Sequence, residues 1–212
     1  MKKTKPKKHT KEKLEKKLRI LAAGDIHGDT KLAQKLAVRA KKEKVDLVIL
    51  TGDITGFIET ENLIKPFLDR DKKVVFVPGN WDAPETSNFL SKHYGIKNLD
   101  NYYVKYKDVG IFGLGNPGML DIDSKEAFQK LSNNFEKIKN LEKKIMVTHL
   151  HAAGTKSELS GFPGNKGIRK ALDKFKPDLF ISGHIHELEG VEEKIGKTRV
   201  INVGRKGKII EI

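Results

Sequence analysis

The sequence predicts an α/β protein in which two mixed β-sheets pack face to face with helices on the outside. The first half of the chain alternates apolar strands with amphipathic helices, a pattern typical of parallel strands joined by crossover helices. The second half adds a hairpin and several closely spaced C-terminal strands, which indicates antiparallel pairing. A third observation concerns the strand ends, since five strands each stop at Gly or Thr followed by a side chain that can bind a metal.

The first half is expected to contain three strands and three helices. Lys31 begins a stretch with Leu32, Leu36 and Ala40 on one helical stripe. Asp82, Pro84 and Glu85 together resemble a helix start, with Asp82 as N-cap and Glu85 at the capping-box position. In chain order the expected elements are strand 18–23, helix 31–44, strand 46–50, helix 60–69, strand 73–77 and helix 85–93.

The second half begins with a hairpin over 101–114 that turns at Lys107-Asp108. A loop rich in Gly, Ser and Lys is expected over 154–167. The other expected elements are helix 124–140, strand 144–147, helix 168–175, strand 178–181 and strands 191–195, 198–203 and 208–212.

The 212 residues fit one domain, over 18–212, preceded by a basic extension over 1–17. Residues 1–17 hold nine Lys and two Glu, so half of the formal net charge of +14 lies there. One interpretation is a solvated extension, and the other is an arm for RNA, DNA or another polyanion. No aromatic residue interleaves with these lysines, so the extension predicts weak electrostatic contact without sequence reading.

The cysteine count and the lengths of the apolar runs exclude several classes of protein. The chain has no cysteine, which excludes disulfides and thiolate metal sites. No apolar run approaches the roughly 20 residues of a membrane span, and no hydrophobic signal region follows the basic start. We therefore expect a soluble cytoplasmic protein without a membrane partner.

Seven side chains at the five strand ends form one set of candidate metal ligands. They are Asp25, His27, Asp53, Asn80, His149, His184 and His186. The carboxyl ends of parallel strands form the natural ligand-binding edge of an α/β sheet, so these side chains are expected to converge. Oxygen and imidazole donors without sulfur suit Mn, Fe, Co, Ni or Zn better than Ca. Seven donors are too many for one catalytic metal and fit two ions that share a carboxylate, an arrangement that can activate a bridging water and clamp a phosphoryl group.

These strand ends resemble the ordered motifs of the calcineurin-like metallophosphoesterases. The resemblance spans residues 18–204 and rests on Gly24-Asp25-Ile26-His27-Gly28, Gly52-Asp53, Gly79-Asn80-Trp81-Asp82, Thr148-His149 and Gly183-His184-Ile185-His186. It implies a four-layer α/β/β/α sandwich and two divalent transition-metal ions, with Mn favoured. It also implies one ion held by Asp25, His27, Asp53 and His186, and a second held by Asp53, Asn80, His149 and His184. Asp53 and Asn80 are thus implied to be catalytic, in a reaction where a metal-bridging hydroxide attacks phosphorus.

One position departs from the family pattern. Many members carry His where Trp81 stands, and that His donates to phosphate oxygens or to the leaving group. Indole carries no charge and cannot act as a general acid. Small bacterial and archaeal phosphodiesterases that lack this His are the most similar branch, so phosphodiesterase activity on a small phosphoester is favoured over monoesterase activity. Asp82, which would orient that His, is expected to cap the next helix instead.

Three further residues are candidates for substrate contacts. His151 lies two residues beyond His149, and it is either a replacement general acid or a histidine at the rim of the site. Trp81 either stacks on an aromatic part of the substrate or packs against the next helix. Lys166 belongs to a loop that leads into a helix N-terminus, which either holds a phosphate or is a solvated rim.

Two alternative functions stay open at this point. The positive charge allows a nuclease or cyclic-nucleotide phosphodiesterase that uses the basic extension. The fold is also used by non-catalytic scaffolds that bind proteins, although such scaffolds usually have degraded ligand positions. The sequence leaves the oligomeric state open.

Overall fold

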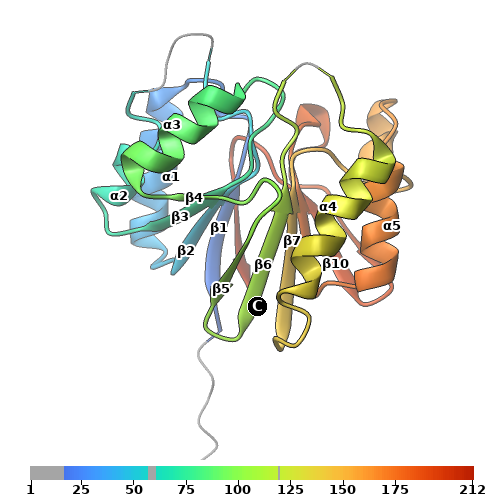
Figure 1. Ribbon diagram of the computed structural model, residues 1–212. Helices are drawn as coiled ribbons and strands as arrows, with labels where there is room; N and C mark the ends of the chain where they lie inside the picture. The colour runs from blue at the N-terminus through green and yellow to red at the C-terminus, as the bar shows by residue number, and fades with distance from the viewer. Residues whose placement is uncertain (1–16, 57–60, 119) are drawn as a thin grey trace, which may run out of the picture.

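The computed structural model describes residues 17–56, 61–118 and 120–212. Residues 1–16 of the expected basic extension lie outside the described part of the chain. The described residues form two β-sheets with helices on the outer face of each (Figure 1).

The first sheet has five strands in the order β11-β1-β2-β3-β4. Strands β1 to β4 are parallel to one another, and β11 pairs antiparallel with β1. The second sheet has six strands in the order β5-β6-β7-β8-β10-β9, in which β5 and β9 are antiparallel edge strands. The strand bounds are β1 Arg19–Ala23, β2 Leu47–Leu50, β3 Lys73–Phe76, β4 Lys97–Asn98, β5 Tyr103–Tyr106, β6 Val109–Leu114, β7 Lys143–Thr148, β8 Leu179–Ser182, β9 Glu192–Ile195, β10 Thr198–Asn202 and β11 Lys208–Glu211.

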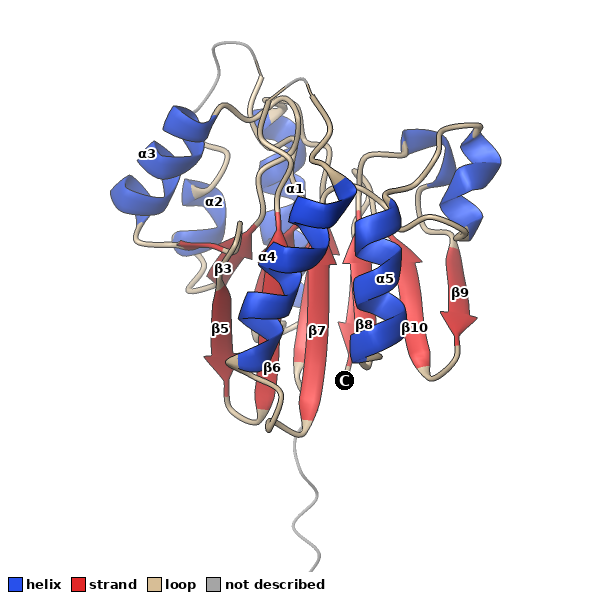
Figure 2. Ribbon diagram, turned by 45° about the vertical axis from the view of Figure 1, so that its right-hand side comes forward, coloured by secondary structure: helices blue, strands red, loops and turns tan. Residues whose placement is uncertain are grey.

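Helices cover the two outer faces. Three helices lie against the first sheet, namely α1 Thr30–Lys42, α2 Lys65–Leu68 and α3 Pro84–Tyr94. Two lie against the second sheet, namely α4 Ser124–Glu136 and α5 Lys166–Phe175, which Figure 2 shows in front of β6, β7 and β8. Short 3₁₀ helices occupy η1 Lys156–Ser160 and η2 His186–Leu188.

The buried apolar side chains form three clusters, one at each boundary between layers. Alternate residues of a strand point to opposite faces, so Leu21 and Val48 pack under the helices of the first sheet while Ile20 and Ile49 face the second sheet. The third cluster lies between the second sheet and its helices α4 and α5. Because the strands are covered on both faces, they read as continuous apolar runs in the sequence. The predicted four-layer α/β/β/α sandwich is confirmed.

The hairpin expected over 101–114 is present as β5 and β6. Helix α2 is shorter than the expected 60–69, and residues 57–60 lie outside the described part. Pro66 explains the later start, because a residue without an N–H is tolerated only in the first turn of a helix. Strand β4 was not predicted, because its two residues are too short for an alternating pattern.

The expected capping role of Asp82 is wrong. Helix α3 begins at Pro84, and its N-cap residue is Ala83, which makes no side-chain capping bond. The Asp82 carboxylate turns instead toward the preceding loops, where it accepts hydrogen bonds from the backbone N–H groups of Ile54, Thr55 and Gly79. The local sequence resembles a helix cap, but the carboxylate instead accepts hydrogen bonds from buried backbone N–H groups of the loops.

Within residues 17–56, 61–118 and 120–212, none of the helices has the length and apolar character needed to cross a lipid bilayer.

Candidate metal centre

All seven candidate ligands lie at one edge of the sandwich, where β1, β2, β3, β7 and β8 end. Asp25 and His27 follow β1, Asp53 follows β2 and Asn80 follows β3. The second sheet contributes three more, since His149 follows β7 and both His184 and His186 follow β8. Two sheets packed face to face therefore bring together residues up to 161 positions apart in the chain.

Two groups of three side chains have donor atoms close enough to hold an ion. In each group the donor atoms lie within 4.8 Å of one another. The first group is Asp25, His27 and His186, and the second is Asp53, His149 and His184. Asn80 joins the second group, because its Oδ1 lies 2.9 Å from His149 Nε2 and 3.1 Å from His184 Nδ1.

Asp53 lies between the two groups. Its Oδ2 is 3.5 Å from His149 Nε2 in the second group and 3.7 Å from His27 Nε2 in the first. Its Oδ1 accepts a hydrogen bond of 2.9 Å from the backbone N–H of Trp81, which fixes the orientation of the carboxylate. One oxygen of Asp53 is thus directed at both groups, as a shared carboxylate requires.

The tautomer of His149 is set by the backbone. Its Nδ1 lies 2.8 Å from the carbonyl oxygen of Thr51. A carbonyl oxygen only accepts, so Nδ1 carries the proton and the lone pair of Nε2 points toward Asp53, Asn80 and His184. Histidines that bind metals typically donate their other N–H in this way.

The backbone is strained at four of the seven candidate positions. Asp25, His27, Asp53 and His184 have positive φ angles of 54°, 49°, 49° and 73°. Left-handed backbone is uncommon in residues other than glycine and costs on the order of 1 kcal/mol or more per residue. Such outliers gather at functional sites, where the surrounding structure holds them in place.

Two glycines keep this edge compact. Gly52 has a φ of +100°, and a Cβ there would come within 2.6 Å of His149 Nδ1. A Cβ at Gly79 would overlap the carboxylate of Asp53. Side chains at these positions would push the donors apart, which accounts for the glycines next to Asp53 and Asn80.

Burial shapes the electrostatics of the centre. It raises the pKa of Asp53 to about 7, and the nearby negative charge of Asp82 adds to that shift, while the hydrogen bond from the Trp81 backbone opposes it. Burial lowers the pKa of His149 and of His184, so both imidazoles are neutral near pH 7. The Asp25 carboxylate raises the pKa of His186, whose Nε2 lies 3.4 Å from Asp25 Oδ1.

The residues present fit a pair of divalent cations. Asp25 is 1% exposed, and its Oδ2 has no hydrogen-bond partner among the described residues. His27 Nε2 and His186 Nε2 lie 3.4 Å apart, and His149 Nε2 and His184 Nδ1 lie 3.2 Å apart. In each group, imidazole nitrogens face one another, and in the first group they lie beside a buried carboxylate oxygen without a partner among the described residues. A bound cation would satisfy these lone pairs and balance the buried negative charge.

Trp81 stands at the rim of the first group. Its indole is 43% exposed and meets the ring of His27 edge to face, with centroids 5.6 Å apart. The side chain therefore contacts a candidate ligand rather than packing only against α3. Its role toward substrate stays a prediction.

Asp82 is the residue of this region whose role sequence reasoning missed. Besides the backbone groups, it accepts a hydrogen bond of 2.8 Å from the Thr55 hydroxyl. It ties the loop after β2, which carries Asp53, to the loop after β3, which carries Asn80. Its place in the motif Gly79-Asn80-Trp81-Asp82 could have indicated a role at the metal centre. The helix-capping pattern, however, explained the same residue more simply.

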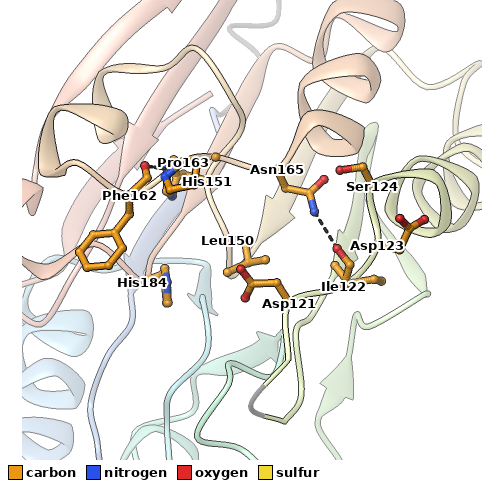
Figure 3. A pocket seen from close by; sticks show the side chains of 11 residues that line it. Asp121, Ile122, Asp123, Ser124, Leu150, His151, Phe162, Pro163, Asn165 and His184 are labelled. Carbon is orange, nitrogen blue, oxygen red and sulfur yellow. Dashed lines mark hydrogen bonds between the residues drawn. The ribbon is translucent and has the colours of Figure 1, made fainter.

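His151 lies beside the centre, on the wall of a cavity of about 350 Å³ that also touches His184 (Figure 3). Its Nε2 lies 3.2 Å from the carbonyl oxygen of Phe162, so Nε2 carries the proton and donates it there. Burial lowers the pKa of His151, so the ring is neutral. A neutral ring whose N–H is already engaged does not favour the predicted general-acid role.

The N-terminus of α5 does not offer a phosphate site. Asn165 caps it, and its Oδ1 accepts from the backbone N–H groups of Gly167 and Ile168. Lys166 is exposed and is not among the residues that line the neighbouring cavity. The helix terminus is therefore satisfied by its own sequence, and substrate binding by Lys166 stays a prediction without support from this geometry.

This fold and this edge define a phosphoesterase with candidate sites for two metals. The family model for calcineurin-like phosphoesterase matches residues 18–188, and the chain belongs to this family. A comparison with curated proteins finds no match.

Solved structures share the fold at low sequence identity. TT1561 of Thermus thermophilus has a TM-score of 0.72 at 16% identity, with 92% of this chain and 99% of that chain covered. A dimetal phosphatase from Danio rerio has a TM-score of 0.60 at 12% identity, with 89% and 88% covered. An archaeal phosphodiesterase has a TM-score of 0.52 at 19% identity, with 92% and 98% covered.

Proposed function

We propose that this phosphoesterase is a phosphodiesterase that works with two divalent metal ions. The observation that carries the proposal is the position of Asp53 Oδ2, which lies 3.5 Å from His149 Nε2 and 3.7 Å from His27 Nε2. In this proposal Asp25, His27 and His186 hold one ion, His149, His184 and Asn80 hold the other, and Asp53 is shared. Mn is the favoured metal, with Fe, Co, Ni or Zn as alternatives, because the ligand set is oxygen and imidazole.

Two such ions supply an activated water and positive charge for the phosphoryl oxygens. The chain's own part is to hold that chemistry in place. The Trp81 backbone N–H orients the Asp53 carboxylate, and the Thr51 carbonyl orients the His149 ring. Asn80 faces both His149 and His184 through its Oδ1, and in this proposal it also contacts the substrate.

The preference for diesters rests on the missing proton donor. Trp81 replaces the usual His, and His151 donates its N–H to Phe162. The nearby guanidinium of Arg205 is engaged with the backbone carbonyls of Asp25 and Ile26 and with the carboxylate of Asp29. Poor leaving groups and the second negative charge of a monoester therefore receive little help from side chains, so diesters with good leaving groups should react best.

Hydrolysis of bis(p-nitrophenyl) phosphate with added Mn²⁺ tests the proposal, with wild type compared with Asp53→Ala. Asp71→Asn is the matched control, because Asp71 has a side chain 92% exposed and lies outside the candidate metal groups. The wild type and the control should be active and the Asp53 variant should not. Equal activity in wild type and Asp53→Ala would overturn the proposal. Comparison with p-nitrophenyl phosphate then measures the preference for diesters.

Weak polyanion contact through residues 1–17 is a separate proposal, supported only by their charge. Deletion of these residues should weaken binding to polynucleotides, or their cleavage, and leave turnover of a small diester unchanged. If neither changes, the extension is not a substrate arm. A cytoplasmic location stays a prediction from the sequence.

The scaffold alternative is less well supported, because all seven candidate ligands are present and converge. Metal analysis of the purified protein separates the two cases. Absence of bound metal, together with no thermal stabilisation by Mn²⁺, would favour a scaffold.

A further inference from the structure

The cavity next to the candidate metal centre has a volume of about 350 Å³, within the range of small-ligand sites. Its walls come from three segments, namely residues 121–124 before and at the start of α4, residues 150–151 after β7, and residues 162–165 before α5. His184, one of the candidate metal ligands, also lines the cavity (Figure 3). The cavity therefore adjoins the candidate metal centre at His184.

The polar side chains that line the cavity differ in how much of their hydrogen-bonding capacity is used within the protein. Asn165 is fully used, because its Oδ1 caps α5 and its Nδ2 donates to the Ile122 carbonyl. One carboxylate oxygen of Asp123 caps α4, and one of Asp121 lies 3.4 Å from Asn116 Nδ2. Among the residues that the structure describes, no hydrogen bond is formed to the second oxygen of either carboxylate, which leaves it open to a donor from a ligand.

His151 provides the second and independent observation. Its Nε2 carries the proton that is donated to Phe162, which leaves the lone pair on Nδ1. The side chain is 2% exposed, and Nδ1 has no hydrogen-bond partner in the part of the chain that the structure describes. An unsatisfied buried acceptor is costly, so a donor from a ligand or a water is expected at this position.

The charge of the cavity also favours a ligand with hydrogen-bond donors over an anion. Asp121 and Asp123 line it, and no lysine or arginine is among the described residues that do. A phosphate or carboxylate group would meet two negative charges there, and no cationic side chain among the described lining residues offsets them. Phe162, with its side chain 59% exposed, adds an apolar face for carbon atoms of a ligand.

We propose that this cavity binds the alcohol part of the substrate, and that this part carries hydrogen-bond donors and no negative charge. The inference rests on the proposed function, since it names the substrate class of the same site. Hydroxyl groups of a glycerol or sugar, or the ammonium group of an amino alcohol, have the required chemistry. A polynucleotide that continued through this cavity would bring a second phosphate to Asp121 and Asp123, so the cavity does not suit a nuclease.

Four diesters with p-nitrophenol as the common leaving group test this substrate class. The other alcohol is 2,3-dihydroxypropyl, 2-aminoethyl, propyl or 2-carboxyethyl. Turnover is measured as the open-chain phosphate monoester of that alcohol, because p-nitrophenol is also released when a neighbouring hydroxyl or amine attacks phosphorus to form a ring. The dihydroxypropyl or the aminoethyl ester should have a kcat/KM about tenfold above that of the propyl ester, mostly through KM, as expected for a hydrogen bond to a charged acceptor. The carboxyethyl ester should fall below the propyl ester. The first two esters separate hydroxyl from ammonium recognition, and equal kcat/KM for all four would overturn the inference.

Two variants locate the effect in the cavity. Asp121→Asn should reduce the advantage of the donor-bearing ester over the propyl ester and raise the relative rate of the carboxyethyl ester. His151→Phe should also reduce that advantage, because it removes the Nδ1 acceptor. Asp71→Asn, a charge change of the same size outside the cavity lining, should leave all ratios at their wild-type values. Unchanged ratios in both cavity variants would overturn the inference.

A binding measurement separates this inference from the proposed function. Glycerol, ethanolamine, 1-propanol and 3-hydroxypropionate are added to chelator-treated protein, and the imidazole ¹⁵N signals of His151 are followed. Glycerol or ethanolamine should shift the Nδ1 signal, while 1-propanol and 3-hydroxypropionate should not. No shift with either donor-bearing probe at saturating concentration overturns the subsite. A shift in a protein that hydrolyses none of the esters would instead overturn the proposed function and leave the subsite standing.

Discussion

The two candidate metal groups differ in how firmly the protein holds them. In the group of Asp53, His149 and His184, the His149 ring is completely buried and its Nδ1 is tied to the Thr51 carbonyl. In the group of Asp25, His27 and His186, His186 is the first residue of the short helix η2, and its side chain is 50% exposed. The group of Asp53, His149 and His184 is preorganised, and we call it the buried group. The group of Asp25, His27 and His186 is open to solvent, and we call it the open group.

This contrast shows that two metal sites that share a carboxylate need not have the same affinity for their ions. A ligand whose orientation is set by packing and by an outer hydrogen bond loses little freedom when it binds an ion. A half-exposed ligand loses more, so we expect the buried group to bind its ion more tightly. The open group should exchange its ion with solvent more readily.

Asp53→Ala should remove the link between the groups and have the largest effect. We expect kcat/KM for bis(p-nitrophenyl) phosphate to fall by about a thousandfold, as for the loss of a central electrostatic group. Elemental analysis should find less than one tightly bound ion per chain. Two tightly bound ions in this variant would contradict the shared role of Asp53.

His149→Ala and His186→Ala test the contrast directly. Removal of His149 should weaken metal binding by about a hundredfold and lower the free energy of unfolding by about 2 kcal/mol, because it leaves a buried cavity and an unpaired Thr51 carbonyl. Removal of His186 should scarcely change stability, and excess Mn²⁺ should restore activity. Titration of activity with Mn²⁺ and urea unfolding measure both effects. Equal behaviour of the two variants would show that burial does not distinguish the groups.

Asp82→Ala tests whether the preorganisation extends beyond the ligands. Asp82 is 1% exposed and accepts hydrogen bonds from the loops that carry Asp53 and Asn80. Its loss leaves buried N–H groups unsatisfied and should reduce the free energy of unfolding by about 3 kcal/mol. Metal affinity should fall about tenfold, mainly in the buried group. Calorimetry with and without Mn²⁺ checks this, and a selective effect on the open group would contradict it.

The affinity for Mn²⁺ should depend on pH through Asp53. Its pKa is raised to about 7, mainly by burial, so below pH 7 protons compete with the ion and apparent affinity should fall by about tenfold per pH unit. In chelator, the raised pKa of Asp53 means that its contribution to stability is complete below about pH 3.8 and is lost as the pH rises through about 7. The lowered pKa values of His149 and His184 act in the opposite sense, with stability lost as the pH falls below 6.5. The rise in Tm on adding Mn²⁺ should therefore be larger at pH 8 than at pH 6.

Trp81→His should have the smallest effect and concerns the open group, which Trp81 contacts through His27. A histidine there would add a titratable proton donor at the rim of the open group. We expect the ratio of p-nitrophenyl phosphate to bis(p-nitrophenyl) phosphate turnover to rise by up to about tenfold, less than the full value of a positioned acid, because Asp82 is already engaged by backbone groups and cannot orient it. An unchanged ratio would contradict the proposal that Trp81 sets a preference for diesters.

The sequence predicted those features that arise from apolar runs and from what directly follows them. Asp25 lies two residues after the strand end at Ala23, and Asp53 lies three residues after the strand end at Leu50, so the candidate ligands could be named from the pattern alone. Asp82 could not be placed, because a local capping pattern and a contact with residues 27 and 28 positions earlier compete for the same carboxylate. The same limit applies to His151, since its partner Phe162 lies in a loop without periodicity.

The left-handed backbone at Asp25, His27, Asp53 and His184 has a consequence for protein engineering. Glycine adopts this conformation without strain, so replacement of any of these residues by glycine would remove a donor and also relieve the backbone. Selection for thermal stability in the absence of metal would therefore favour glycine at His27 and His184, whereas Asp25 and Asp53 also accept backbone hydrogen bonds that glycine would lose. A stabilised variant of this enzyme should be selected with metal present, because here fold stability and activity make opposite demands on the same residues.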